Sequence, residues 1–310
     1  MRLALEAAFW LLALASHWLL PTQLPLLSQV WIVALFVLSL DLLVGFAGVL
    51  TLGHAAFFGL GAYAAGILAQ QGWGEPISGL LVAAVLAALL GLATAPLVLR
   101  GGDLPALMVT LGLSLMLAEA ANKLPGLTGG ADGLLGVEMW SILGLFRFDL
   151  FGHTAFFYSL AVLFLLFLLA RLVTGSPFGL ALRGIRGNAR RMPAIGTPVR
   201  ARLVAAYALS AAYAGVAGAL LAQTTQFVSL DALSFQRSAE GLLMLVLGGL
   251  GGLYGAMLGA AAFTFAHHVL SEMSPLFWQF WIGVALVALA LAGRGGLLGL
   301  GAALLRRGRA

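Results

Sequence analysis

The chain has 310 residues, of which 62% are hydrophobic and 9% are charged, and its formal net charge is +5. Ordinary globular proteins carry about a quarter charged residues, so this composition excludes a typical water-soluble protein. The sequence contains no cysteine, which excludes disulfides and thiol chemistry within these residues.

The apolar residues form long runs rather than helical stripes. No charged residue occurs between Glu6 and Asp41 or between Asp41 and Glu75. A spanning helix needs roughly 20 apolar residues, whereas a spanning strand would alternate polar and apolar residues, which these runs do not. We therefore predict an all-α, polytopic transmembrane helical bundle, forming a single domain over residues 1–310. Its ten membrane segments, some short or broken, are expected near residues 3–20, 26–50, 54–70, 77–99, 104–122, 151–171, 203–222, 238–250, 254–271 and 275–292.

Two of these segments allow alternatives. Residues 1–20 could be a signal peptide, but Glu6, His17 and the lack of a cleavage site favour a retained first span. Residues 238–250 are short for a straight span. They could form a half-helix, a re-entrant segment, or the first part of one long helix that includes 254–271.

The basic residues predict the orientation. With both termini in the cytoplasm, only Lys123, Arg147 and Arg237 fall outside. The other 13 of the 16 basic residues lie inside, as the positive-inside rule requires. They are Arg2, Arg100, Arg171, Arg183, Arg186, Arg190, Arg191, Arg200, Arg202, Arg294, Arg306, Arg307 and Arg309. Residues 293–310 are then a basic cytoplasmic tail.

Two glycine-rich segments, Gly45–Gly66 and Gly248–Ala260, lie in the two halves of the chain. Small residues let helices pack closely, and glycines also let a helix break and present backbone groups to a solute. Packing alone explains the glycines equally well. If they mark a transport site, the candidate pathway residues are Asp41, Gly45, Gly48, Thr51, Gly53, His54, Gly59, Gly61, Thr110, Glu240, Gly248 and Gly249.

Ionisable groups inside the spans indicate a structural or functional role, because burying them in lipid is costly. Asp41 has apolar residues on both sides, so we expect it to face the bundle and find a donor, as a helix contact or as a pathway residue. His54 is expected to be an interfacial hydrogen-bonding group, and Glu240 to lie at the outer start of its segment. No metal-ligand spacing is present.

The loop over residues 174–202 carries six arginines and no acid. Ser176-Pro177 is typical of a helix start, and Gly196 followed by Pro198 of a stop. We therefore predict a short cytoplasmic helix between them. It would either anchor the loop to anionic lipid or dock a cytoplasmic partner.

These segments together resemble the permease subunits of branched-chain amino-acid ABC importers, particularly the LivM-like branch, whose relatives include urea and short-amide systems. The resemblance runs from about Leu40 to Ala261. It rests on the two glycine-rich segments and on the stretches RGGD at 100–103, TGGADGL at 128–134, LRGIRGNARRMPAIG at 182–196 and SAAYAGVAGAL at 210–220. The family commonly has acidic residues where this chain has Gly187 and Ala189.

The resemblance implies that residues 182–196 are a coupling helix that sits in a groove of an ATPase subunit. The residues concerned would be Leu182, Arg183, Ile185, Arg186, Asn188, Arg190, Ile195 and Gly196. It also implies a second, homologous or identical permease subunit, two cytoplasmic ATPase subunits and an external solute-binding protein, in a bacterial-type inner membrane. Neither a cofactor nor nucleic acid is expected.

An enzyme and an ion-coupled transporter are the other classes to weigh. The only lysine is Lys123, so these residues contain no phosphate-binding loop, and an ATPase would be a separate polypeptide. No nucleophile or metalloprotease motif is present. An ion-coupled secondary transporter or channel would use an intramembrane acid such as Asp41 or Glu240.

Overall fold

The computed structural model describes residues 2–142, 144–149 and 151–273, and the isolated positions 277, 280, 281, 283, 284 and 296. Within these residues the chain is helical and has no strand, with only two isolated β-bridges. The all-α prediction is confirmed for them. The predicted segment 275–292 and the tail 293–310 lie outside the described residues, apart from the isolated positions.

The helices begin and end close to the predicted boundaries. They are α1 (Arg2–Leu19), α2 (Leu24–Leu40), α3 (Ala55–Gln70), α4 (Pro76–Val98), α5 (Asp103–Lys123), α6 (Pro125–Thr128), α7 (His153–Gly175), α8 (Pro177–Asn188), α9 (Val199–Thr225), α10 (Phe235–Gly248) and α11 (Leu253–Met273). A π-helical stretch, Asp41–Ala47, continues α2, and Leu230–Leu233 forms a 3-10 turn before α10.

Six helical segments among the described residues are long and apolar enough to cross a bilayer. They are Pro21–Ala47, Pro76–Val98, Asp103–Lys123, His153–Gly175, Val199–Thr225 and Leu253–Met273. The apolar helix α3 has only 16 residues. The chain is therefore a multi-pass membrane protein.

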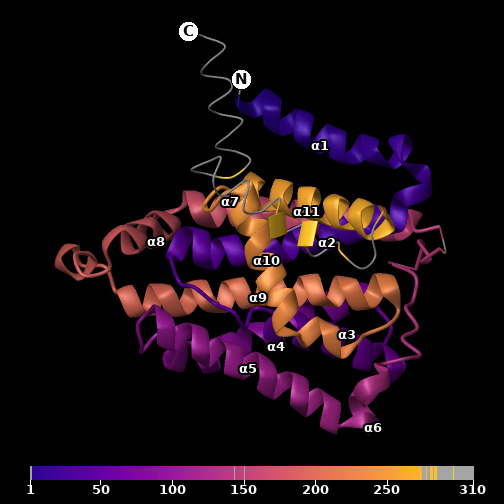
Figure 1. Cartoon of the computed structure of the whole chain (residues 1–310), viewed down its shortest axis with the longest axis horizontal. Coiled ribbons are helices and arrows are strands. Elements are labelled where there is room, and N and C mark those ends of the chain that lie inside the picture. Colours follow the sequence, from indigo (N-terminus) through magenta and orange to yellow (C-terminus); the bar gives the residue numbers. More distant parts are fainter. Residues whose placement is uncertain are drawn as a thin grey trace.

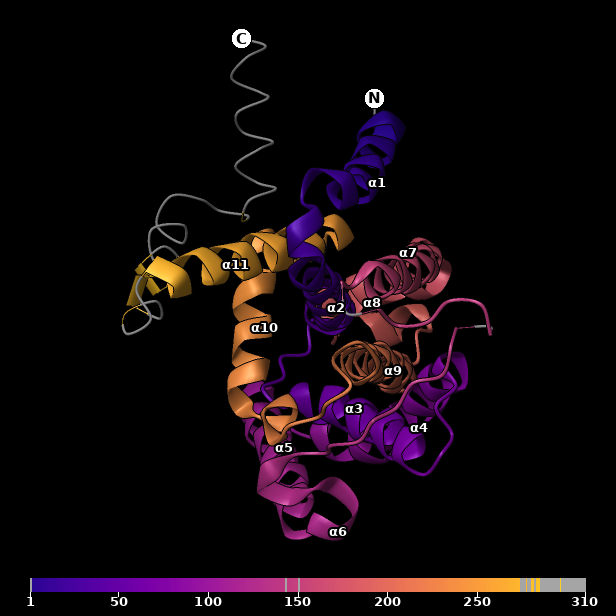
Figure 2. The ribbon, with the colours of Figure 1, turned by 90° about the vertical axis from the view of Figure 1, so that its right-hand side faces the viewer.

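The bundle is built around α9, which packs against α2, α3 and α4 (Figure 1). Seen along the bundle, α2 and α9 appear nearly end-on, whereas α10 and α11 run across the view (Figure 2). α1 lies apart from the main bundle and touches it through an Arg171–Glu6 ion pair of 2.5 Å and the ring contact of Trp10 with Phe164. The long helices thus define one direction, and α10 crosses it.

Small residues bring α3, α9 and α4 close together. A Cβ at Gly61 on α3 would overlap the carbonyl of Gly215 on α9, and Gly215 in turn lies against Ala83 and Ala87 of α4. A side chain at Gly59 would meet Leu233. Both predicted glycines therefore face other parts of the protein rather than lipid, as close helix packing requires.

Two interruptions distinguish the fold from a simple bundle. After Gly48 (φ 75°) the chain leaves the helix, and α3 begins only at Ala55. The second interruption follows α10, whose 14 residues extend about 21 Å, less than the ~30 Å hydrocarbon core. Positive φ angles at Gly249 and Gly251 separate α10 from α11, so the alternative of one continuous helix is wrong.

Candidate functional site

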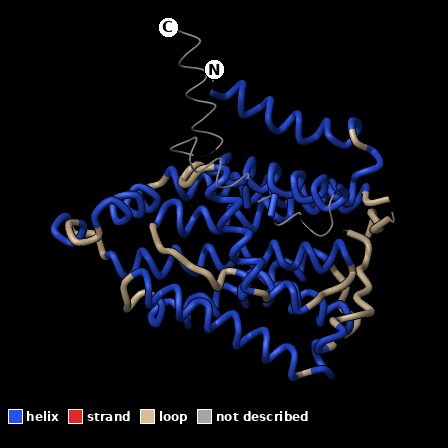
Figure 3. Tube along the Cα trace, in the orientation of Figure 1, coloured by secondary structure: helices blue, strands red, loops and turns tan. Residues whose placement is uncertain are grey.

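The first interruption, residues 48–54, runs inward from the end of α2 as a tan stretch in Figure 3. Non-helical backbone inside a membrane protein must be satisfied by protein or line a water-filled space. Here the N–H of Leu52 donates to Thr110 Oγ1 (3.2 Å), and the N–H of Gly53 donates to Thr51 Oγ1 (3.3 Å). A Cβ at Gly53 would overlap the Thr110 carbonyl, so only glycine fits against α5. Thr51, Gly53 and Thr110, all predicted pathway residues, meet here.

A buried layer of hydroxyl groups surrounds the start of α3. His54 Nε2 lies 2.9 Å from Ser39 Oγ and 3.3 Å from Ser210 Oγ, and the Ala55 N–H donates to Ser238 Oγ (2.8 Å). These contacts join the end of α2, the starts of α3 and α10, and the middle of α9. The predicted hydrogen-bonding role of His54 agrees with the structure. The side chain is fully buried and contacts Ser210 near the middle of α9, which is deeper along the helix direction than predicted.

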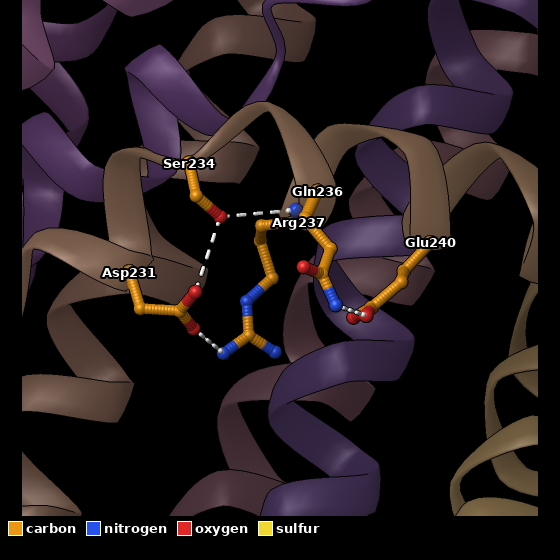
Figure 4. Close-up of polar contacts among 5 residues, drawn as sticks. All are labelled: Asp231, Ser234, Gln236, Arg237 and Glu240. Atoms are coloured by element: carbon orange, nitrogen blue, oxygen red, sulfur yellow. Dashed lines mark hydrogen bonds and ion pairs between the residues drawn. The ribbon is translucent and has the colours of Figure 1, made fainter. Parts of the chain in front are cut away.

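A charged cluster lies beside this layer, at the start of α10 (Figure 4). Arg237 Nη2 contacts Asp231 Oδ2 at 3.1 Å, and Gln236 Nε2 donates to Glu240 Oε1 at 2.9 Å. Ser234 Oγ accepts the N–H of Arg237 (3.2 Å) and caps the helix. We call Asp231, Ser234, Gln236, Arg237 and Glu240 the α10 cluster.

The α10 cluster lies deeper along the helix direction than the sequence suggested. Leu233, within the turn that leads into α10, accepts a hydrogen bond from Ser114 Oγ (2.8 Å), and Ser114 stands near the middle of α5. The sequence placed Arg237 in an outer loop and Glu240 at an outer helix start. The structure brings the turn before α10 to the level of the middle of α5, whereas the side of the membrane stays a prediction. Sequence reasoning also missed Asp231. The signal that could have found the cluster is the close spacing of Asp231, Arg237 and Glu240 in a short apolar segment.

A second polar group lies just after the C-terminal end of α2, in its π-helical continuation. Asp41 is fully buried, and its Oδ1 accepts the N–H of Gly251 (2.7 Å), so the expectation that it finds a donor is confirmed. The guanidinium of Arg186 donates to the carbonyl of Gly45. A Cβ at Gly48 would lie 2.9 Å from Arg186 Cγ. We call Asp41, Gly45, Arg186 and Gly251 the α8 junction.

α8 begins as predicted, with Ser176 Oγ accepting the N–H of Phe178 (3.2 Å). The helix ends at Asn188, a 3-10 turn covers Met192–Ile195, and Gly196 takes the expected left-handed conformation (φ 79°). Leu182 and Ile185 are buried against the bundle, whereas Ile195 is 73% exposed. One face of α8 is therefore anchored.

The arginines in and after α8 differ in whether the structure shows a contact between their guanidinium groups and α2. Arg183 lies over the ring of Phe46, 5.0 Å from its centroid, and Arg186 belongs to the α8 junction. Arg190 and Arg191 follow the end of the helix and are exposed. The side chains of the first two therefore reach back to the π-helical end of α2.

The predicted pathway residues thus separate into groups. Thr51, Gly53, His54 and Thr110 surround the interruption, and Gly59 and Gly61 lie further along α3. Asp41, Gly45 and Gly48 belong to or border the α8 junction. Glu240 belongs to the α10 cluster. Gly248 lies against Gly255 at the turn between α10 and α11, and Gly249 supplies the positive φ of that turn.

Comparison with known proteins gives one consistent family. The family model described as "Branched-chain amino acid transport system / permease component" matches residues 23–292. The chain is 29% identical over 264 residues to the high-affinity branched-chain amino acid transport system permease protein LivM of Escherichia coli K12, and 31% identical over 265 residues to that of Salmonella typhimurium LT2.

Each match covers 76% of this chain but 61% of the relative, so the chain spans about three fifths of the length of these curated relatives. No solved structure matches. The family model, by contrast, includes both interruptions, the α10 cluster, the α8 junction and α8 itself. On that match, the chain belongs to the family of branched-chain amino acid transport system permease components.

Proposed function

We propose that this chain is a membrane-spanning permease subunit of an ATP-driven importer for branched-chain or other hydrophobic amino acids. It would act in a bacterial-type inner membrane with a second permease subunit, two cytoplasmic ATPase subunits and an external solute-binding protein. The observation that carries the proposal is the family match over residues 23–292, which includes an amphipathic helix joined to an interrupted bundle.

The geometry of α8 suggests how a partner could act on the membrane segments. Its buried residues Leu182 and Ile185 pack on the bundle, while Arg183 and Arg186 contact the π-helical end of α2. A displacement of α8 would therefore move that end directly. In this proposal residues 174–202 face the cytoplasm, and α8 is the coupling helix.

The contacts divide the predicted coupling residues between two tasks. Arg186 is engaged within the chain, so we assign it to transmission rather than to ATPase contact. Docking would fall to the exposed end of the segment, which holds Asn188, Arg190, Arg191 and Ile195. Arg186→Glu would place a carboxylate beside the Gly45 carbonyl and near Asp41, and would disturb the α8 junction whether or not a partner docks.

The test uses the importer reconstituted from its separately expressed subunits in proteoliposomes. The double variant Arg190→Glu, Ile195→Asp should insert normally but lose ATPase co-purification and ATP-dependent leucine uptake. Arg100→Glu, an exposed arginine outside α8, is the matched control and should retain both. Normal assembly and uptake with the double variant would contradict the assignment of these residues to ATPase docking. Absence of ATP-dependent uptake by the unsubstituted complex would contradict the proposed function.

Asp41 supports a second candidate, an ion-coupled transporter, because its Oδ2 is buried and has no hydrogen-bond partner. An ion or proton site needs the carboxylate charge. The Gly251 N–H needs only an acceptor, which asparagine retains. We expect Asp41→Asn to keep ATP-dependent leucine uptake within about threefold, because one neutral hydrogen bond is worth roughly 1 kcal/mol. Uptake by the unsubstituted chain that follows an ion gradient without ATP, and is abolished by Asp41→Asn, would favour the second candidate.

A further inference from the structure

The α10 cluster combines both signs of charge on a face that the described part of the chain leaves partly exposed. Side-chain exposure is 61% for Asp231 and 21% for Arg237. Arg237 Nε is buried and has no hydrogen-bond partner, although Nη2 is paired with Asp231. The guanidinium therefore keeps a donor that nothing in the described chain satisfies.

The depth of the cluster makes its exposure significant. Leu233 is bonded to Ser114 near the middle of α5, and Ser238 is bonded to the start of α3. Phe58, one turn into α3, lies with its ring centroid 6.0 Å from Arg237 Cζ. Residues at this level would face hydrocarbon if the cluster pointed to lipid. Charged side chains within the membrane almost always face a bundle interior or a water-filled cavity, so this face borders water rather than lipid.

The chemistry of the cluster matches one class of solute. A guanidinium presents several donors in a planar fork that fits a carboxylate, and the carboxylates of Asp231 and Glu240 accept from an ammonium. An α-amino acid carries both groups on one carbon. Phe235, at the start of α10 and 42% exposed, adds an apolar neighbour for a hydrophobic side chain.

We propose that the α10 cluster is a binding site in the translocation pathway for the zwitterionic head group of an amino acid, with Arg237 receiving the carboxylate and Asp231 and Glu240 receiving the ammonium. The inference rests on the proposed function and adds to it a location and a recognition chemistry. The site is open on one side, and the second permease subunit completes it.

The first test measures whether the α10 cluster is accessible to water. Because the sequence contains no cysteine, a single introduced cysteine can be labelled specifically. Single variants Gln236→Cys and Leu89→Cys are placed in the reconstituted complex and treated with a membrane-impermeant charged thiosulfonate, and modification is scored on this chain by mass. Leu89 is 54% exposed near the middle of α4 and is the control at similar depth. Because the thiolate is the reactive form and does not form in lipid, Gln236→Cys should react at least about tenfold faster.

Protection experiments identify the ligand chemistry. Leucine should slow the modification of Gln236→Cys, whereas 3-methylbutylamine, which lacks the carboxylate, and 4-methylpentanoate, which lacks the amine, should not. Equal protection by all three compounds would contradict zwitterion recognition. A Gln236→Cys thiol as unreactive as Leu89→Cys would show that the cluster does not border water in the complex, and would overturn the proposal.

Substitution of the cation gives an independent readout. Arg237→Gln should lower the leucine moved per ATP hydrolysed by at least about tenfold, since charge-assisted hydrogen bonds are roughly twice as strong as neutral ones. Arg237→Lys, which keeps the charge but not the fork, should recover part of this ratio. If the unsubstituted complex transports leucine and Arg237→Gln does so at the same ratio, the inference fails while the proposed function stands.

Discussion

Gly61 on α3 allows the helix packing to be tested with a single methyl group. A Cβ there would overlap the carbonyl of Gly215 on α9, a backbone atom that cannot rotate away. Moving α9 would press Gly215 onto Ala83 and Ala87 of α4. Overpacking of a well-packed core costs about 1–3 kcal/mol, and alanine regains about 1 kcal/mol over glycine in a helix. With a backbone clash we take the upper end and expect Gly61→Ala to destabilise the protein by about 2 kcal/mol.

The assay is thermal unfolding of the purified chain in detergent, with leucine uptake by the reconstituted complex as the functional readout. Gly112→Ala is the matched control, because Gly112 also lies within a helix but has open space where a Cβ would be placed. That variant should be unchanged or more stable by up to about 1 kcal/mol. Equal unfolding midpoints for Gly61→Ala and Gly112→Ala would refute the assignment of Gly61 to a close backbone contact.

Two further predictions concern the start of α3 and the orientation. Ser238→Ala removes the acceptor of the Ala55 N–H and should destabilise the protein by about 1–3 kcal/mol, because a buried donor is left unsatisfied. Ser28→Ala is the control. It loses only a hydrogen bond within its own helix turn and should destabilise the protein less. Equal losses of stability in the two variants would contradict the assignment of Ser238 as the acceptor of the Ala55 N–H. Ile195→Cys and Leu145→Cys, 73% and 77% exposed, should be labelled from the cytoplasmic and external sides respectively. Labelling from the same side would mean that the predicted orientation is wrong.

The long helices could be predicted from the sequence because apolar runs in lipid have few ways to satisfy their backbone. α4 and α5 were expected at 77–99 and 104–122 and are found at Pro76–Val98 and Asp103–Lys123. The capping signal of α8 was also visible, because a Ser-Pro pair acts through neighbouring residues. The types of neighbouring residues thus identified most helices and several of the helix ends.

Depth could not be predicted in the same way. Residues 48–54, if extended, cover roughly 20 Å at about 3.3 Å per residue, whereas a helix of that length covers about 10 Å. A count of residues along the chain therefore put His54 at the interface, whereas the structure packs its buried side chain against Ser210, near the middle of α9. The turn before α10 was expected at a helix end for the same reason, whereas its Leu233 carbonyl accepts a hydrogen bond from Ser114, near the middle of α5.

Contacts between distant residues were also beyond the sequence. The Ala55 N–H is satisfied by a serine 183 residues away, and Arg186 bonds the carbonyl of Gly45, 141 residues before it. A single sequence carries no signal for such pairs. The sequence consequently assigned Arg186 to a partner surface and Gly45 to a pathway, whereas the structure brings them together.

The interruption between α2 and α3 has a mechanical consequence. A continuous helix transmits rotation from one end to the other. Residues 48–54 break the helix between α2 and α3. The end of α2 is hydrogen-bonded instead, through Asp41, to Gly251 in the turn after α10. Torsion on the end of α2 therefore reaches the turn after α10 through the Asp41–Gly251 hydrogen bond, and reaches α3 through side-chain contacts such as that between Ser39 and His54.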